Sequence, residues 1–430
     1  MIKLSVNDFS CIDHAEIELG SLTVLIGPQA SGKSVISKLV NFCVRILSEQ
    51  LRVIESGQTI KAFKSKLRAD FNVWFPKSAW GDKSFQIFFE AGSYSVKFSR
   101  LKKVGNDEVD PTIEFSTYFE NNFKLLSEEW DQTREQLKSD IPDKDRSLSR
   151  ELEAFWQFQN IAESRLEDEL GGDYLESQLF IPAGRAFFTS LGKSYALLEQ
   201  GSALDPVTAQ FGRLYSRIRD QRLPYLYNES SRKKIDSSPS ENLMTEFFGG
   251  TIKLAKNEEY IESSDGRKVP FSALSSGQQE LMPLWLATRW LLRNQTTNDL
   301  IYVEEPEAHL FPSAQESLTR YLASFVAQPE GNRRLFLTTH SPYVLAGLNN
   351  LLKAGELSAK LPEEQLIKLS SVVSMDVWLK PGAVKAYAIR DKVAFSIIDE
   401  DGFIDTNYLD EISNDVANTY SSLLDLEYEK

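Results

Sequence analysis

The chain has 430 residues, of which 42% are hydrophobic and 26% charged, a composition typical of globular proteins with about two or three domains. It has no apolar run of about 18 residues, no signal-peptide pattern and only two cysteines, so we expect a cytoplasmic protein with no membrane span and no disulfide framework. The formal net charge of −14 argues against nucleic-acid binding over the whole surface.

The start of the chain predicts a strand, a glycine-rich loop and a helix, in that order. Residues 21–26 are apolar and β-rich, and residues 35–47 have the composition of a helix. The loop between them matches the pattern G-x-x-x-x-G-K-[ST], in which backbone N–H groups and a helix N-terminus bind phosphate. Lys33 would then contact the β- and γ-phosphates of ATP, and the Ser34 hydroxyl would bind Mg²⁺; a chance turn rich in glycine and serine is the alternative. The loop residues are Gly27, Pro28, Gln29, Ala30, Ser31, Gly32, Lys33 and Ser34.

The middle of the chain changes from strands to helices. Aromatic and β-branched residues alternate over 71–118 and predict antiparallel strands. Residues 119–170 are polar and predict two helices, separated at Asp140-Ile141-Pro142-Asp143. Further along, a cluster of arginines is interpreted as a solvated helix face, although a local basic surface for nucleic acid is the alternative. These are Arg213, Arg217, Arg219 and Arg222.

Residues 274–279 predict the start of a helix that offers phosphate a second binding site. A serine hydroxyl and the first N–H groups of a helix expected over 280–292 can bind an anion. The segment Leu274-Ser275-Ser276-Gly277-Gln278-Gln279 resembles the ABC signature L-S-G-G-Q, with Ser276 in place of the first glycine. The resemblance implies that Ser275, Ser276, Gly277 and Gln278 bind a nucleotide held by another subunit; an ordinary serine N-cap is the alternative.

An apolar strand over 300–303 ends in two acids, Glu304 and Glu305. Adjacent side chains of a strand point to opposite faces, so the two carboxylates can have different roles. The pattern resembles a Walker B motif. This implies that Glu304, where Asp is usual, binds Mg²⁺ through water and that Glu305 polarises the attacking water. Two exposed acids after a core strand are the alternative.

Two of the three histidines lie in further motifs. His309 belongs to residues 306–312, Pro-Glu-Ala-His-Leu-Phe-Pro, which resemble a segment of the OLD and RecF ATPases. His340 follows an apolar strand over 335–339 and resembles the switch histidine that contacts the γ-phosphate. A histidine with a purely structural role at a strand end is the alternative.

In chain order, these motifs resemble those of ABC-type ATPases of the OLD/RecF-like branch, within the AAA family of ATP-binding proteins. The resemblance implies an α/β fold: an ABC-type P-loop nucleotide-binding domain, with a mixed sheet flanked by helices and an inserted, mainly helical region. Residues 1–118 would form its N-terminal half, 119–245 the insertion and 246–430 the C-terminal half. Lys33, Glu305 and His340 would catalyse slow, partner-regulated hydrolysis of ATP, with Mg²⁺ as cofactor.

A predicted strand over 179–181 leads into Ile181-Pro182-Ala183-Gly184-Arg185. This stretch resembles the I-P-A-x-R segment of OLD-like and defence ATPases. Arg185 would contact phosphate or a neighbouring subunit, or would form a structural salt bridge, and the sequence leaves these alternatives open. Gln178 is a candidate for the Q-loop glutamine of such ATPases.

The resemblance also implies a head-to-head homodimer, or a larger homo-oligomer, that closes around ATP and is reset by hydrolysis. The chain lacks the clustered acids of a Toprim nuclease and the histidines of an HNH nuclease, so we expect any such effector to be a separate protein. In this the chain resembles the ATPase subunits of two-gene anti-phage defence systems such as PARIS, with a Toprim partner, or Septu, with an HNH partner. A RecF-like DNA-repair ATPase that binds duplex DNA and a nucleotide-binding scaffold that barely hydrolyses ATP are the alternatives.

Overall fold

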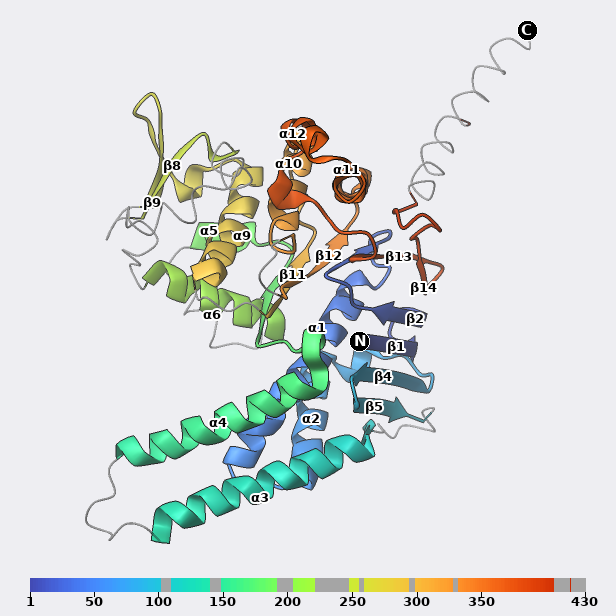
Figure 1. Cartoon of the computed structure of the whole chain (residues 1–430), viewed down its shortest axis with the longest axis vertical. Coiled ribbons are helices and arrows are strands. Elements are labelled where there is room, and N and C mark those ends of the chain that lie inside the picture. Colours follow the sequence, from blue (N-terminus) through green and yellow to red (C-terminus); the bar gives the residue numbers. More distant parts are fainter. Residues whose placement is uncertain are drawn as a thin grey trace.

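The computed structural model describes residues 1–101, 110–139, 148–191, 204–220, 247–254, 259–293, 298–327, 332–405 and 418. These residues form an α/β architecture in which helices cover both faces of an 11-stranded sheet (Figure 1). A three-stranded sheet lies to one side of it. The mixed α/β fold expected from the sequence is confirmed.

The strands of the large sheet come from both ends of the chain. Their order across the sheet is β6-β5-β4-β1-β2-β14-β13-β3-β12-β11-β7. These strands are β1 (Ile2–Phe9), β2 (Ile12–Glu18), β3 (Leu22–Ile26), β4 (Phe85–Ala91), β5 (Tyr94–Arg100), β6 (Thr112–Phe115), β7 (Ser177–Ile181), β11 (Asp299–Glu304), β12 (Arg334–Thr339), β13 (Val384–Arg390) and β14 (Val393–Ser396). The small sheet contains β8 (Gly250–Leu254), β9 (Glu259–Ser263) and β10 (Lys268–Pro270).

The helices connect the strands and form the outer layers. The α-helices are α1 (Lys33–Glu55), α2 (Ile60–Trp74), α3 (Thr117–Ser139), α4 (Leu148–Leu170), α5 (Ala186–Leu191), α6 (Pro206–Asp220), α9 (Ser276–Arg293), α10 (Pro312–Ala323), α11 (Pro342–Ser358) and α12 (Glu363–Val372). Short 3₁₀ turns are η1 (Lys77–Ala79), η2 (Gly171–Asp173), η5 (Phe271–Ala273) and η6 (Met375–Val377).

The sheet has an antiparallel half and a parallel half. Strands β6, β5, β4, β1 and β2 pair antiparallel, whereas β13, β3, β12, β11 and β7 pair parallel. Parallel neighbours need long crossover connections, and α1, α9, α10 and α11 lie in these connections. The carboxyl ends of the parallel strands therefore meet at one edge, where the motifs predicted from the sequence lie.

Strand alternation divides the buried residues into two cores on opposite faces of the sheet. Leu300 and Tyr302 of β11 lie in a core with residues of α1, α2, α3 and α4. Ile301 and Val303 lie in the other core, with residues of α6, α9, α10 and α11. Because successive side chains of a strand point to opposite faces, the continuous apolar run over 300–303 is buried on both sides.

Helix α1 is held firmly beneath the sheet. Its residues Ile36, Val40, Cys43 and Leu47 recur at helical spacing, and all four are buried. Burial raises the pKa of the Cys43 thiol, so this cysteine is an inert part of the core. The phosphate-binding loop thus leads into a helix that is buried along most of its length.

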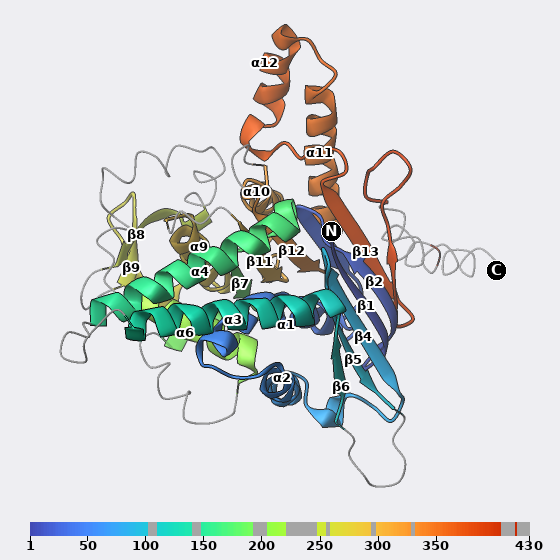
Figure 2. The same ribbon diagram turned by 60° about the horizontal axis from the view of Figure 1, so that its bottom comes forward.

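The segment expected to be a helical insertion begins with the long hairpin of α3 and α4, which packs against α1 (Figures 1 and 2). The Trp130 indole donates a hydrogen bond to the Glu55 carbonyl, 3.1 Å away. The separator expected at 140–143 lies outside the described residues, as do 221–246 and the chain after 405 apart from 418. Strand β7, within the same segment, pairs with β11, so the segment also contributes to the main sheet.

The arginine cluster on α6 differs in part from the solvated face that we expected. Arg213 and Arg217 are exposed, but Arg219 is 7% exposed and forms an ion pair with Glu259 of β9. Arg222 lies outside the described residues. The side of α6 that carries Arg219 therefore packs against the small sheet instead of facing water.

Candidate functional site

The strand register brings the predicted motifs to one edge of the sheet. Ile26 of β3 pairs with Thr339 of β12, and Thr338 pairs with Glu304 of β11. The phosphate-binding loop starts one residue after Ile26, and His340 follows Thr339 directly. Segments far apart in the sequence therefore become neighbours because parallel strands end at a common edge.

The loop between β3 and α1 has the backbone that its glycine pattern predicts. Gly32, just before α1, has φ +103°, a left-handed conformation that L-residues with side chains rarely adopt. A Cβ at Gly32 would collide with Cδ1 of Ile12. Glycine at this position is therefore required both by the backbone conformation and by close packing against β2.

Lys33 lies at the centre of the site. Its side chain is buried, and Nζ donates hydrogen bonds to the carbonyls of Gly27 at 2.9 Å and Pro28 at 2.8 Å. Burial lowers the pKa of the Lys33 ammonium, and the carboxylates of Glu305, Glu307 and Glu304 oppose this shift. Ser34, the next residue in the chain, is exposed, so its hydroxyl is accessible to a bound ion.

Glu304 ends β11 with its carboxylate turned toward α1. Oε1 accepts a hydrogen bond from Ser37 Oγ at 2.9 Å, and Oε2 accepts a longer one from the Ala183 backbone N–H at 3.4 Å. Ser37 had no role in the sequence analysis. The sequence could have pointed to Ser37, because it lies one turn after Ser34 on the apolar side of a helix. A buried serine in such a position needs a hydrogen-bond partner.

Glu305 lies just beyond the strand in a strained conformation. Its φ is +43°, which is costly for a non-glycine residue and is typical of functional sites. This conformation places Oε1 2.9 Å from Nε2 of His340, while Nδ1 of His340 lies 3.4 Å from Lys33 Nζ. The three residues expected to be catalytic, Lys33, Glu305 and His340, are thus connected in the structure.

Glu307 fixes the backbone that carries His340. Its Oε1 accepts hydrogen bonds from the His340 N–H at 2.6 Å and from Thr339 Oγ1 at 2.8 Å. The side chain is 9% exposed, and its Oε2 has no hydrogen-bond partner among the described residues. The sequence placed Glu307 in a motif but gave it no role, because its partners lie on another strand.

The signature-like segment faces outward. Ser276 begins α9, and the hydroxyl of Ser275 accepts a hydrogen bond from the Gln278 N–H at 3.4 Å. The side chains of Ser275 and Ser276 are exposed. A Cβ at Gly277 would lie 3.0 Å from the carbonyl oxygen of His309, so the segment packs directly against the Pro306–Pro312 motif. Within the described residues, no hydrogen bond connects it to the phosphate-binding loop of the same chain.

The position of Arg185 distinguishes between contact with phosphate or a neighbouring subunit and a structural salt bridge. Its side chain is fully buried, 3.7 Å from the carboxylate of Glu280, so it reaches neither solvent nor a neighbouring subunit. Burial lowers the pKa of the Arg185 guanidinium, and the carboxylate of Glu280 offsets this. The structural ion pair is therefore the interpretation that fits.

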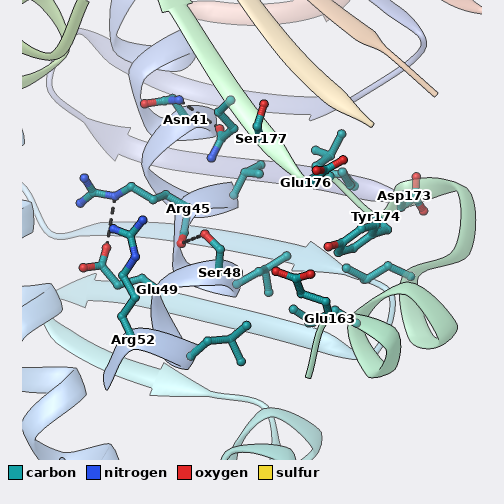
Figure 3. A pocket seen from close by; sticks show the side chains of 18 of the residues that line it. Asn41, Arg45, Ser48, Glu49, Arg52, Glu163, Asp173, Tyr174, Glu176 and Ser177 are labelled. Atoms are coloured by element: carbon teal, nitrogen blue, oxygen red, sulfur yellow. Dashed lines mark hydrogen bonds and ion pairs between the residues drawn. The ribbon is translucent and has the colours of Figure 1, made fainter. Parts of the chain in front are cut away.

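Gln178 lies away from the phosphate-binding loop. Its Oε1 accepts hydrogen bonds from Asn41 Nδ2 at 3.0 Å and from the Tyr302 hydroxyl at 2.8 Å. It lines a cavity of about 340 Å³ between α1, α4 and β7, where Figure 3 shows Arg45 and Glu163 on different walls. Within residues 178–185, the residue that contacts Glu304 is Ala183 and not Gln178. The geometry therefore does not support Gln178 as a Q-loop glutamine.

The donor atoms at this edge suit Mg²⁺ bound together with a phosphate. Mg²⁺ prefers hard oxygen ligands and commonly takes one or two from the protein and the rest from phosphate and water. The Ser34 hydroxyl and the Glu304 carboxylate are such ligands, and hydrogen bonds to Ser37 and Ala183 hold the carboxylate in place. Among the described residues, no group of three or more acidic, histidine or cysteine side chains could hold a metal ion.

A family model matches residues 22–346 of the chain. Its description is "AAA domain, putative AbiEii toxin, Type IV TA system". The chain belongs to this family. The match includes the phosphate-binding loop, Glu304 at the end of β11, Glu305 and His340, so membership identifies the chain as an AAA ATPase.

The solved structures that match this chain include SMC head domains. The head domain from Thermotoga maritima is 13% identical, with a TM-score of 0.37, and the match covers 92% of this chain and 97% of that one. A Pyrococcus furiosus head domain with an extended coiled coil, bound to the C-terminal domain of ScpA, is 11% identical with a TM-score of 0.40, covering 97% and 100%. At this level of similarity they say nothing about the function of this chain. A search of curated protein sequences finds no relative.

No helix within the described ranges combines the length and apolar character needed to cross a bilayer.

Proposed function

We propose that this protein binds ATP with Mg²⁺ at Gly27–Ser34 and hydrolyses its β–γ bond. The observation that carries the proposal is the connection of Lys33, His340 and Glu305 at the edge of the sheet, beside a Glu304 carboxylate held by Ser37. Lys33, Glu305 and His340 come from three different motifs. Their convergence would be unexpected if the motifs were separate turns, caps and loop acids.

In this proposal the residues of the site have separate tasks. The loop N–H groups and Lys33 hold the phosphates, which positions the γ-phosphoryl group for in-line attack. Ser34 and Glu304 would hold Mg²⁺, which neutralises charge on the phosphate oxygens. Glu305 orients the attacking water and accepts its proton, and His340 keeps the Glu305 carboxylate directed toward the phosphate end of the site.

We further propose that two copies close head-to-head around ATP. Ser275 and Ser276 are exposed, as a segment that binds the nucleotide of another subunit must be. Two large aromatic side chains are exposed beside the site, Phe311 at 77% and Tyr343 at 53%. Phe311 follows the Pro306–Leu310 segment and Tyr343 follows His340 by three residues, so closure of a dimer would bury apolar surface next to the nucleotide.

Mass photometry and phosphate release test both steps on the same samples. We expect Glu305→Gln to assemble with ATP and Mg²⁺ while its hydrolysis falls about 100-fold or more, because it lacks the base but keeps the binding site. Lys33→Ala should neither assemble with ATP nor hydrolyse it. Lys38→Ala, a lysine on α1 outside the loop that pairs with Asp205, is the matched control and should behave as wild type. ATP-independent assembly in all four proteins would exclude the switch model and favour a constitutive scaffold.

We propose that the ATP-dependent state controls a separate effector in anti-phage defence, such as a Toprim or HNH nuclease. The description of the family as a putative toxin of a type IV TA system supports a role in a two-component system. Co-expression with the product of the adjacent gene, followed by phage challenge, tests this. Protection should require both proteins and should be lost with Lys33→Ala.

The net charge of −14 disfavours duplex DNA as the main partner. We expect no binding to a 30-base-pair duplex at physiological salt with or without ATP, a length of about three helical turns that can accommodate a dimer. Tight, salt-sensitive binding that requires ATP would instead support a DNA-repair ATPase.

A further inference from the structure

The guanidinium of Arg185 binds three parts of the candidate site at once. It lies just beyond β7 and is fully buried. A guanidinium has five N–H donors, and five main-chain carbonyls surround this one at hydrogen-bond distance. Nε donates to Glu280 at 3.0 Å, Nη1 to Pro182 at 3.2 Å and Glu304 at 2.8 Å, and Nη2 to Glu305 and Pro306 at 3.3 Å each.

Three of these carbonyls belong to consecutive residues that leave the sheet. β11 ends at Glu304, and Glu305 has φ +43°, so the chain turns sharply and the carbonyls of 304–306 point to the same side. Buried carbonyls need partners, and a backbone in this conformation persists only when its surroundings hold it. Arg185 donates the hydrogen bonds that these carbonyls need, and the same bonds hold the backbone in this conformation.

The same guanidinium reaches the first turns of α9, immediately after the signature-like segment. It binds the main-chain carbonyl of Glu280, and the Glu280 carboxylate lies 3.7 Å from Nε. This carboxylate is buried, and its Oε2 has no hydrogen-bond partner among the described residues. Glu280 therefore balances the buried charge and ties Arg185 to the helix that would touch the nucleotide of a second subunit.

We propose that Arg185 is a positioning residue that holds the backbone of 304–306 so that Glu305 faces His340, and that it couples this geometry to the signature helix α9. The proposal rests on the proposed ATPase function. It assigns Arg185 no contact with nucleotide. If α9 shifts when the dimer closes, the planar guanidinium of Arg185 would transmit the movement to the backbone of Glu305.

Arg185→Lys tests the proposal, because lysine keeps the charge but offers a single ammonium in place of the planar fork. Arg334→Lys is the matched control. Arg334 is also a buried arginine and binds main-chain carbonyls of Leu19 and Gly172, but it lies at the opposite end of β12 from His340. Each protein is assayed well below its unfolding temperature for ATP affinity, kcat and amide hydrogen exchange over 304–310.

We expect Arg185→Lys to bind ATP within threefold of wild type, to lose at least tenfold in kcat, and to exchange amides over 304–310 at least tenfold faster. Arg334→Lys should lower the unfolding temperature while leaving all three measurements unchanged. A folded Arg185→Lys protein with wild-type kcat and exchange would overturn the proposal, as would equal losses of affinity and kcat. Amide exchange over 304–310 does not depend on hydrolysis. If the wild type proved inactive, the ATPase function would be refuted, and exchange would still test the role of Arg185.

Glu280→Gln provides an independent variant, since it keeps the main-chain carbonyl and the shape of the side chain. Removing the balancing carboxylate should accelerate exchange over 304–310 and lower kcat severalfold, with ATP affinity unchanged. If Arg185→Lys is insoluble, this variant decides the question. Wild-type kcat and exchange in Glu280→Gln would refute the link between α9 and the Glu305 backbone.

Discussion

Glu307 offers a direct test of how the switch strand is held. One buried carboxylate oxygen accepts two short hydrogen bonds, from the His340 N–H and from Thr339 Oγ1. Hydrogen bonds to a charged group contribute about 1.5–3 kcal/mol each, so Glu307→Ala should destabilise the protein by about 3–6 kcal/mol and leave two donors unpaired. Glu307→Gln keeps an acceptor of the same shape but no charge, so it should lose about half as much.

Chemical unfolding and ATP hydrolysis together provide the assay. The order of stability should be wild type, then Glu307→Gln, then Glu307→Ala, and kcat should fall in the same order as His340 loses its position. Glu316→Gln, an exposed glutamate on α10 that pairs with Arg320, is the control and should be neutral. If Glu307→Ala unfolds within about 0.5 kcal/mol of wild type, the two hydrogen bonds do not stabilise the strand end and the reasoning is wrong.

Further predictions follow from single residues of the site. Gly277→Ala should weaken ATP-dependent assembly and lower the unfolding temperature, because its Cβ would lie 3.0 Å from the His309 carbonyl, whereas Gly172→Ala, with no atom within 4 Å of its Cβ, should do neither. Glu305→Asn should be at least as stable as Glu305→Gln in a denaturation assay, since asparagine tolerates positive φ better, yet equally inactive; lower stability would indicate that φ +43° costs nothing. In Glu307→Gln the alkaline limb of the pH–rate profile should move to lower pH, because the Glu307 charge raises the pKa of Lys33 and its removal leaves burial less opposed; an unchanged limb would show that Lys33 does not control it.

The local motifs were predictable because each depends on residues adjacent in the chain. The glycine spacing of the phosphate-binding loop, the two acids after an apolar run and the serine before α9 each specify a short backbone geometry. The apolar run over 300–303 likewise predicted a strand. Assignments that required knowledge of packing were less secure, as Arg219 and Gln178 show: one is buried against another sheet, and the other is held by Asn41 and Tyr302.

The sequence by itself determined the chemical identity of the phosphate-binding loop and the acids, because backbone conformation and side-chain type set these locally. Only the tertiary structure decided which groups meet. Parallel register places His340 beside Glu305 and Ser37 beside Glu304, and burial turns Arg185 from a candidate contact with phosphate into the side chain that holds the turn after β11. Such relations depend on strand order and on the balance of buried charges, which no window of adjacent residues contains.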